Sequence, residues 1–262
     1  MSFNPADNIQ DLQNFGEFGG VNPSISDSST YTFMAAKTMA DTFEGNTDGC
    51  HLYSRHTTPS NLCLGEALAA MEGTETANVS ASGMGAITPV LLQLCGAGDH
   101  IVSSRTIYGG TYAFLKNFTP RLAIQTSFVD ITNLEIVEAS ITENTKVLYC
   151  ESVSNPLLEV ADIKGLAALA KKYSLTLVVD NTFSPLSISP IQLGADVVVH
   201  SLTKFINGSS DAVGGVVCGS QEFIDQLRSV IDGACMLLGS TMDSLRASSI
   251  LKNLRTLHIR MK

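Results

Sequence analysis

VVVHSLTKF, residues 197–205, is an apolar strand followed by two hydroxyl groups and a lysine. Three consecutive β-branched residues favour a strand that is buried on both faces. Lys204 stands out because a lysine is rarely buried without a partner. A second apolar run, residues 175–179, precedes it in the chain and ends at Asp180. The two runs therefore predict neighbouring buried strands that end in opposite charges.

Ligands of open α/β sheets bind outside the carboxyl ends of parallel strands, so Lys204 and Asp180 are expected to face one crevice. A lysine amine opposite a carboxylate points to pyridoxal 5′-phosphate. The lysine would form a Schiff base, and the acid would pair with the pyridinium nitrogen. The alternative is a surface lysine and a strand-end aspartate, which also arise as structural ion pairs. These two residues alone leave both interpretations open.

Composition narrows the class of protein. With 262 residues, the chain is long enough for one large domain or two small ones. Hydrophobic residues make up 44% and charged residues 16%, which predicts a sizeable core. A net charge of −9 argues against nucleic acid as a partner. No apolar run has the roughly 18 residues of a membrane span, and the first residues lack a signal-peptide pattern. We therefore expect no membrane partner.

Cysteine and histidine spacing gives no sign of disulfides or metal ligands. The six cysteines include no C-x-x-C pair, and several lie inside apolar segments. They are typical of reduced core residues in a cytoplasmic protein. The five histidines show no ligand spacing, so no metal site is predicted.

Residues 49–262 are expected to form one large domain, in which helical and strand patterns alternate from Pro59 onward. This predicts an α/β fold with a mostly parallel sheet covered on both faces. Residues 1–48 are polar and aperiodic, apart from a short helix expected at 34–42, and indicate an extended N-terminal arm that lies on its own body or on a partner subunit. Helices are predicted at 60–71, capped by Ser60, and at 83–94, 110–118, 132–140, 162–173, 221–231 and 242–261. Strands are predicted at 76–81, 100–104, 123–129, 145–151, 175–180, 197–201 and 213–218.

The turn Ser82-Gly83-Met84 is a candidate phosphate site. It follows a predicted strand and opens a predicted helix, whose first N–H groups and dipole favour an anion. Gly83 allows close backbone approach. Ser201 and Thr203 would add hydroxyl donors beside Lys204. The alternative for Ser82-Gly83-Met84 is an ordinary strand-to-helix turn. The alternative for Ser201 and Thr203 is that their hydroxyls cap the end of the strand.

Seven segments of the chain resemble one enzyme family. They are SLTKF with the following NGSSD, VVDNTFSP, ASGMGAI, YGGTYAF, ESVSNP and YSRHTTPSN. Together they are similar to the Cys/Met-metabolism family of pyridoxal-phosphate-dependent enzymes, over about residues 29–262. The resemblance implies the large domain of the aspartate-aminotransferase-like fold, known as fold type I, with pyridoxal 5′-phosphate as cofactor.

The resemblance also implies roles for individual residues. Lys204 is expected to be the Schiff-base lysine and Asp180 the partner of the pyridinium nitrogen. Tyr108 would stack on the ring and assist proton transfer, and Asn155 would contact cofactor or substrate, with Glu151 in the wall of the site. The phosphate contacts implied are the turn at Ser82, Gly83 and Met84 with the hydroxyls of Ser201 and Thr203. Tyr53 and Arg55 would reach the phosphate of a neighbouring subunit's cofactor, which implies a homo-oligomer with shared sites, a dimer or a tetramer.

The implied activity is a carbon–sulfur lyase acting on an amino acid, with methionine cleaved to methanethiol, 2-oxobutanoate and ammonia. Other branches of the family give the alternatives: cystathionine γ-synthase or γ-lyase, or O-acetylhomoserine sulfhydrylase. Methionine-cleaving members often carry a cysteine where this chain has Gly110. Family chains also continue into a smaller C-terminal domain that holds the arginine for the substrate carboxylate, and we expect this domain to be absent here. A further alternative is therefore a truncated chain that binds cofactor but catalyses poorly, or an assembly subunit.

Overall fold

Seven strands form one sheet in a computed structural model that describes residues 3–12, 19–44 and 49–262. Their order across the sheet is β1-β7-β6-β5-β4-β2-β3. Strands β2 to β6 run parallel to one another, whereas β7 is antiparallel to both of its neighbours, β1 and β6. The strands are β1 (Thr76–Ser80), β2 (His100–Ser104), β3 (Gln125–Val129), β4 (Thr145–Glu151), β5 (Thr176–Asp180), β6 (Val197–Ser201) and β7 (Gly215–Gly219). The predicted α/β class and mostly parallel sheet are confirmed.

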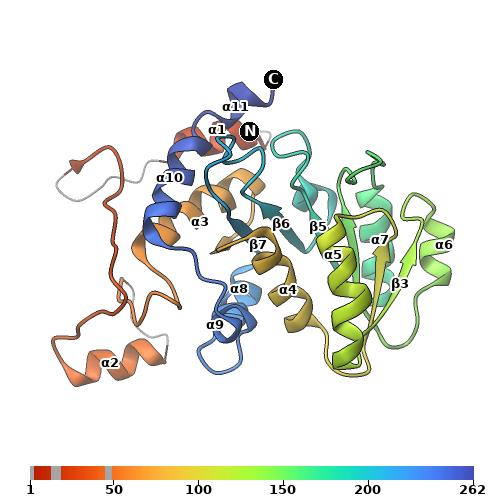
Figure 1. Cartoon of the computed structure of the whole chain (residues 1–262), viewed down its shortest axis with the longest axis horizontal. Helices are drawn as coiled ribbons and strands as arrows, with labels where there is room; N and C mark the ends of the chain where they lie inside the picture. Colours follow the sequence, from red (N-terminus) through yellow and green to blue (C-terminus); the bar gives the residue numbers. More distant parts are fainter. Residues whose placement is uncertain (1–2, 13–18, 45–48) are drawn as a thin grey trace.

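Helices cover both faces of the sheet (Figure 1). They are α1 (Pro5–Asp11), α2 (Ala36–Phe43), α3 (Pro59–Glu72), α4 (Gly83–Leu94), α5 (Gly109–Ala113), α6 (Leu134–Ala139), α7 (Ile163–Tyr173), α8 (Gln221–Arg228), α9 (Ala234–Leu238), α10 (Ser244–Leu254) and α11 (Leu257–Arg260). A π-helical turn, Phe114–Phe118, continues α5. Within the described ranges, no helix is long and apolar enough to cross a membrane.

The central strands supply two cores because their side chains alternate between faces. On β6, Val198 packs with residues of α3, α7 and α10, including Leu64 and Leu166. Val197 and Val199 face the other way and pack with residues of α4, α8 and α9, including Val90. The continuous apolar run is thus explained by burial on both sides. This arrangement leaves the carboxyl ends of β4, β5 and β6 as the shared edge at which ligands can bind.

Several element boundaries differ from the sequence prediction by one or more residues, and three of these differences concern a helix cap, a break or an early end. Helix α3 is capped by Thr58, whose hydroxyl accepts the Asn61 N–H, and not by Ser60, which lies inside the helix. The helix expected over 242–261 is broken into α10 and α11, and the Thr256 hydroxyl donates to the Asn253 carbonyl where the two meet. The helix expected over 221–231 already ends at Arg228.

The N-terminal segment lies partly on the body of the chain. Asn8 of α1 donates to the Ala70 carbonyl of α3 at 3.1 Å, and the Ser26 N–H donates to the Ser60 hydroxyl at 3.0 Å. Helix α2 stands apart from the sheet and its covering helices (Figure 1). Residues 1–2, 13–18 and 45–48 of the predicted arm lie outside the described residues, and the domain boundary at 48/49 stays a prediction.

Candidate active site

A cavity of ≈ 240 Å³ lies at the carboxyl ends of β4, β5 and β6. It brings together nine of the predicted site residues: Ser82, Gly83, Met84, Tyr108, Asn155, Asp180, Ser201, Thr203 and Lys204. Glu151, expected in the wall of the site, also lines it. The prediction that Lys204 and Asp180 face one crevice is confirmed, because β5 and β6 pair as parallel neighbours.

Asp180 is held at the cavity edge by Thr182. The Thr182 hydroxyl and N–H donate to the same carboxylate oxygen, Oδ1, at 2.6 and 3.0 Å. Burial raises the pKa of Asp180, and the Thr182 hydrogen bonds oppose that rise. Within the described part of the chain, Asp180 has no ion-pair partner. The carboxyl group is therefore fixed in place, with no ion-pair partner among these residues to offset its burial.

Glu151 places a second carboxyl group near Asp180. Its two oxygens accept backbone N–H groups, Oε1 from Tyr108 at 2.6 Å and Oε2 from Asn155 at 2.8 Å. Burial raises the pKa of Glu151 to about 7, and the neighbouring Asp180 charge adds to the rise. Glu151 thus anchors the two loops that carry Tyr108 and Asn155, and the pair of buried acids makes this part of the cavity favourable for a cation.

The opposite side of the cavity is suited to an anion. Ser82 caps the twelve-residue helix α4 and accepts the Gly85 N–H at 2.9 Å. The N–H groups of Gly83 and Met84 are at the helix start, where no carbonyl of the helix can pair with them. A Cβ atom at Gly83 would lie 2.8 Å from Cβ of Ser201, so glycine is needed for this close approach. The turn combines free donors with the positive end of the helix dipole.

The lysine follows β6 in a turn and its side chain is exposed at the cavity. Within the residues that the structure describes, its amine makes no ion pair. The Thr203 hydroxyl accepts the Gly214 N–H at 3.1 Å, which ties the turn to the start of β7. Lys204 is thus a free amine on a well-anchored turn, which is what a covalent attachment point requires.

Tyr108 sits at the N-terminus of α5, with its ring exposed toward the cavity. A Cβ atom at Gly110 would lie 2.5 Å from Cε1 of this ring. Gly110, the position where a cysteine was expected in methionine-cleaving relatives, therefore leaves room for the ring in its present place. Any side chain there would require the Tyr108 ring to move.

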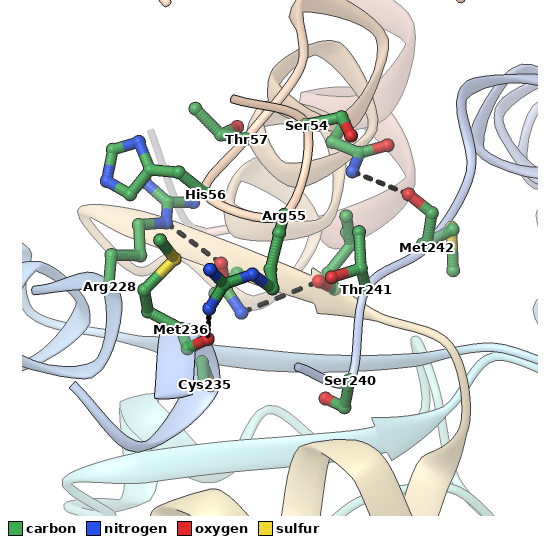
Figure 2. A pocket seen from close by; sticks show the side chains of 13 residues that line it. Ser54, Arg55, His56, Thr57, Arg228, Cys235, Met236, Ser240, Thr241 and Met242 are labelled. Atoms are coloured by element: carbon green, nitrogen blue, oxygen red, sulfur yellow. Dashed lines mark hydrogen bonds between the residues drawn. The ribbon is translucent and has the colours of Figure 1, made fainter. Parts of the chain in front are cut away.

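Tyr53 and Arg55 are not part of this cavity. Arg55 donates through Nη1 to the Met236 carbonyl at 2.8 Å, and its guanidinium lies 5.6 Å from the centre of the Tyr53 ring. Both Arg55 and Arg228 line a separate pocket (Figure 2), whose volume is only ≈ 20 Å³. A contact of Tyr53 and Arg55 with a partner's cofactor would form only in an oligomer, so it stays a prediction.

Thr182 is the main site residue that the sequence reasoning missed. It donates to Asp180 and accepts the Ser201 N–H at 2.8 Å, so it connects the acid to the strand that leads to Lys204. The signal was present as Asp-x-Thr, a spacing at which a hydroxyl and N–H commonly bond back to a strand-end aspartate.

Comparison with known proteins agrees with this geometry. The sequence profile of the Cys/Met metabolism PLP-dependent enzyme family matches residues 7–262. The chain belongs to this family. It is 47% identical to the methionine gamma-lyase of Arabidopsis thaliana, over 98% of this chain and 60% of that protein. It is 40% identical to the O-succinylhomoserine sulfhydrylase of Pseudomonas aeruginosa, over 89% of this chain and 57% of the relative.

A solved structure described as an O-acetylhomoserine (thiol)-lyase from Campylobacter jejuni has a TM-score of 0.88 and 28% identity. The match covers 98% of this chain and 72% of that one, which contains a pyridoxyl-lysine monophosphate. The aspartate-aminotransferase-like fold expected from the resemblance is thereby supported. The chain spans about 60% of the length of the first curated relatives it matches.

The residues present fit pyridoxal 5′-phosphate, the cofactor of this family. The cofactor needs an amine for covalent attachment, an acid for its ring nitrogen and donors for its phosphate. The cavity supplies all three, as the Lys204 amine, the buried Asp180 carboxyl and the N–H groups of Gly83 and Met84. A pyridinium would give the buried Asp180 the cation that it lacks among the described residues.

Proposed function

We propose that this chain forms the cofactor-binding part of a carbon–sulfur lyase of sulfur amino acid metabolism, with L-methionine as its substrate. The observation that carries the proposal is the cavity that joins Lys204, Asp180 and the Gly83 turn. The choice of methionine rests on the 47% identity to a protein named methionine gamma-lyase. The expected products are methanethiol, 2-oxobutanoate and ammonia.

Bound pyridoxal phosphate supplies an electron sink for negative charge that develops on the substrate. The N–H groups of Gly83 and Met84, with the Ser201 hydroxyl, would hold its phosphate. Asp180 would keep the ring nitrogen protonated, because a carboxylate fixed by two Thr182 donors stabilises a positive neighbour.

Two residues are placed to move protons. The Lys204 Nζ would act as the base that takes a proton from the substrate Cα. The Tyr108 hydroxyl would donate a proton to the departing thiolate sulfur. Glu151 would act through position alone, since both of its oxygens are occupied in holding the Tyr108 and Asn155 loops.

A second candidate is a different branch of the same chemistry, in which a thiol adds to an activated homoserine or cystathionine is cleaved. Gly110 favours this candidate, because the cysteine often found there in methionine-cleaving relatives is replaced by a residue without a side chain. The relative named O-succinylhomoserine sulfhydrylase, at 40% identity, also supports it.

We further propose a homo-oligomer in which Tyr53 and Arg55 serve a neighbouring subunit's site, and a cytoplasmic location. Six free cysteines support the location, because thiols persist in a reducing compartment.

The decisive experiment has two stages. Borohydride reduction of the cofactor-loaded chain, followed by peptide mapping, should place a stable pyridoxyl group on Lys204, and Lys204→Ala should abolish the label. A label on another lysine would refute the assignment. Turnover is then measured with methionine, cystathionine, and O-acetylhomoserine plus sulfide. The substrate with the largest kcat/KM decides between the two candidates, and labelling without turnover would support the view of a poorly catalytic cofactor-binding chain.

A further inference from the structure

A cluster of buried polar side chains lies behind the cavity, on the α3 face of the sheet. We call it the Glu72 network. Its members are Glu72, Ser152, Asn181, Ser184 and His200, and each is at most 5% exposed. They are surrounded by the apolar core that includes Leu68, Val198 and Leu202. Burying so many polar groups is unfavourable unless they are closely paired, which makes their arrangement informative.

The contacts of the network converge on two residues. His200 Nε2 donates to Glu72 Oε1 at 2.6 Å, and Asn181 Nδ2 donates to the same oxygen at 3.3 Å. The Asn181 Oδ1 accepts the hydroxyls of Ser152 at 2.7 Å and Ser184 at 2.8 Å. The facing carboxylate places a proton on Nε2 of His200, because an acceptor-only group needs a donor opposite it.

Two polar atoms of the network lack the hydrogen-bond partners that a purely structural cluster would be expected to provide. Glu72 Oε2 and His200 Nδ1 are buried without a hydrogen-bond partner among the described residues. A well-packed apolar pair of the same volume would often stabilise a core equally well or better. Stability alone therefore does not account for a buried acid and imidazole here.

The position of the network relates it to the cavity. Three of its members are sequence neighbours of cavity residues: Ser152 follows Glu151, Asn181 follows Asp180, and His200 precedes Ser201. Side chains of consecutive strand residues point to opposite faces. The cavity residues therefore occupy one face of β4, β5 and β6, while the network binds the same three strand ends together on the other.

The location of the network at these strand ends is important because the β5–β6 pairing ends at the cavity. The last paired residues are Asp180 and Val199, and the Asn181 N–H makes one further bond to the Val199 carbonyl at 2.9 Å. Beyond that point, side chains set the distance between the two strands. On the cavity face, Thr182 does so by accepting the Ser201 N–H. On the far face, only the Glu72 network among the described residues connects Asn181 to His200.

We propose that the Glu72–His200 pair is a positioning element of the cofactor site. It holds the ends of β5 and β6 at the spacing that brings Asp180 and the Ser201–Lys204 turn to opposite parts of the cofactor's ring. The proposal rests on the proposed function, since it concerns the same cavity, and it assigns a role to two residues that touch neither cofactor nor substrate.

The test replaces the pair by apolar residues, so that no buried charge is left unpaired. The double variant Glu72→Leu/His200→Leu is compared with His200→Gln, which keeps a donor toward Glu72. The control is His100→Leu, which removes another buried histidine, one that contacts the hydroxyls of Thr145 and Ser127 at the amino end of β2, away from the cavity. Measured are pyridoxal phosphate affinity, the visible circular dichroism of the bound cofactor, and urea unfolding of the cofactor-free chain.

The double variant should keep its unfolding midpoint close to that of the native chain. It should nevertheless bind the cofactor about tenfold more weakly and lose most of the visible dichroism, which reports how the ring is held. His200→Gln should retain most of the cofactor affinity and of the visible dichroism. His100→Leu should leave both of these properties unchanged.

Unchanged affinity and dichroism in the double variant would overturn the inference and leave the proposed function intact. An equal loss in His100→Leu would also overturn it, because the effect would then be general destabilisation. If the native chain itself did not bind pyridoxal phosphate, the proposed function would fail, and this inference with it. Labelling of Lys204 in the native chain separates the two cases.

Discussion

Glu151→Gln tests the electrostatics of the cavity directly. The native side chain is buried, accepts two backbone N–H groups, and faces the Asp180 carboxyl. Burial first, and the Asp180 charge second, raise the pKa of Glu151 from 4.5 to about 7 in the folded chain. Glutamine has nearly the same shape and does not titrate, so the exchange removes the proton equilibrium and little of the volume.

The sign of the effect follows from proton binding. Between the ordinary and the raised pKa, the folded chain holds a proton on Glu151 that the unfolded chain has released. The resulting stability is fully present below the ordinary pKa and is lost as the pH rises through the folded pKa. For values of 4.5 and about 7, the native chain loses about 2.5 kcal/mol of unfolding free energy between about pH 5 and about pH 8 from this group. The glutamine variant should not lose it.

The assay is urea unfolding of the cofactor-free chain at both pH values. The stability of Glu151→Gln relative to the native chain should rise by about 2.5 kcal/mol from about pH 5 to about pH 8. Any hydrogen bond that glutamine makes poorly costs the same at both pH values and cancels in this comparison. Glu143→Gln, at an exposed loop position, controls for the loss of one carboxyl group. A relative stability that changes by less than about 0.5 kcal/mol, or in the opposite direction, would refute the reasoning.

Three further predictions concern the same site. Gly83→Ala places a Cβ 2.8 Å from Cβ of Ser201, so cofactor affinity should fall about tenfold or more in a fluorescence titration, and an unchanged affinity would contradict the close-approach argument. Thr182→Val removes a hydroxyl donor and leaves the partly buried Ser201 N–H without its acceptor, so urea unfolding should show a loss of about 1–3 kcal/mol. A neutral result would mean that the hydroxyl is not needed. Mixing Lys204→Ala chains with Arg55→Ala chains should recover cofactor affinity above that of either variant alone, since one site per mixed dimer would be intact, and no recovery would mean that the sites are not shared.

Local sequence determined the strands and their ends. The run Val197–Val199 and the run before Asp180 are strands because β-branched residues pack well on a surface buried on both sides, and alternation with helices made them parallel. The glycine after Ser82 marked the turn that opens α4, and Gly73 marked the end of α3, where it adopts a positive φ of 78°. Each of these signals lies within a few consecutive residues, so it could be recognised from the sequence alone.

Tertiary structure decided the properties that depend on distant partners. Glu72 and His200 are 128 positions apart, and no local pattern indicates that they meet at 2.6 Å. The raised pKa of Glu151 depends on burial and on the strand pairing that sets it beside Asp180. The antiparallel orientation of β7 and the break between α10 and α11 were likewise not predicted from the sequence. Local chemistry in the sequence identified Lys204, Asp180 and the Gly83 turn, and the family resemblance added Tyr108 and Asn155. The pKa shifts, spacing and support of these residues arise only when the strands are assembled.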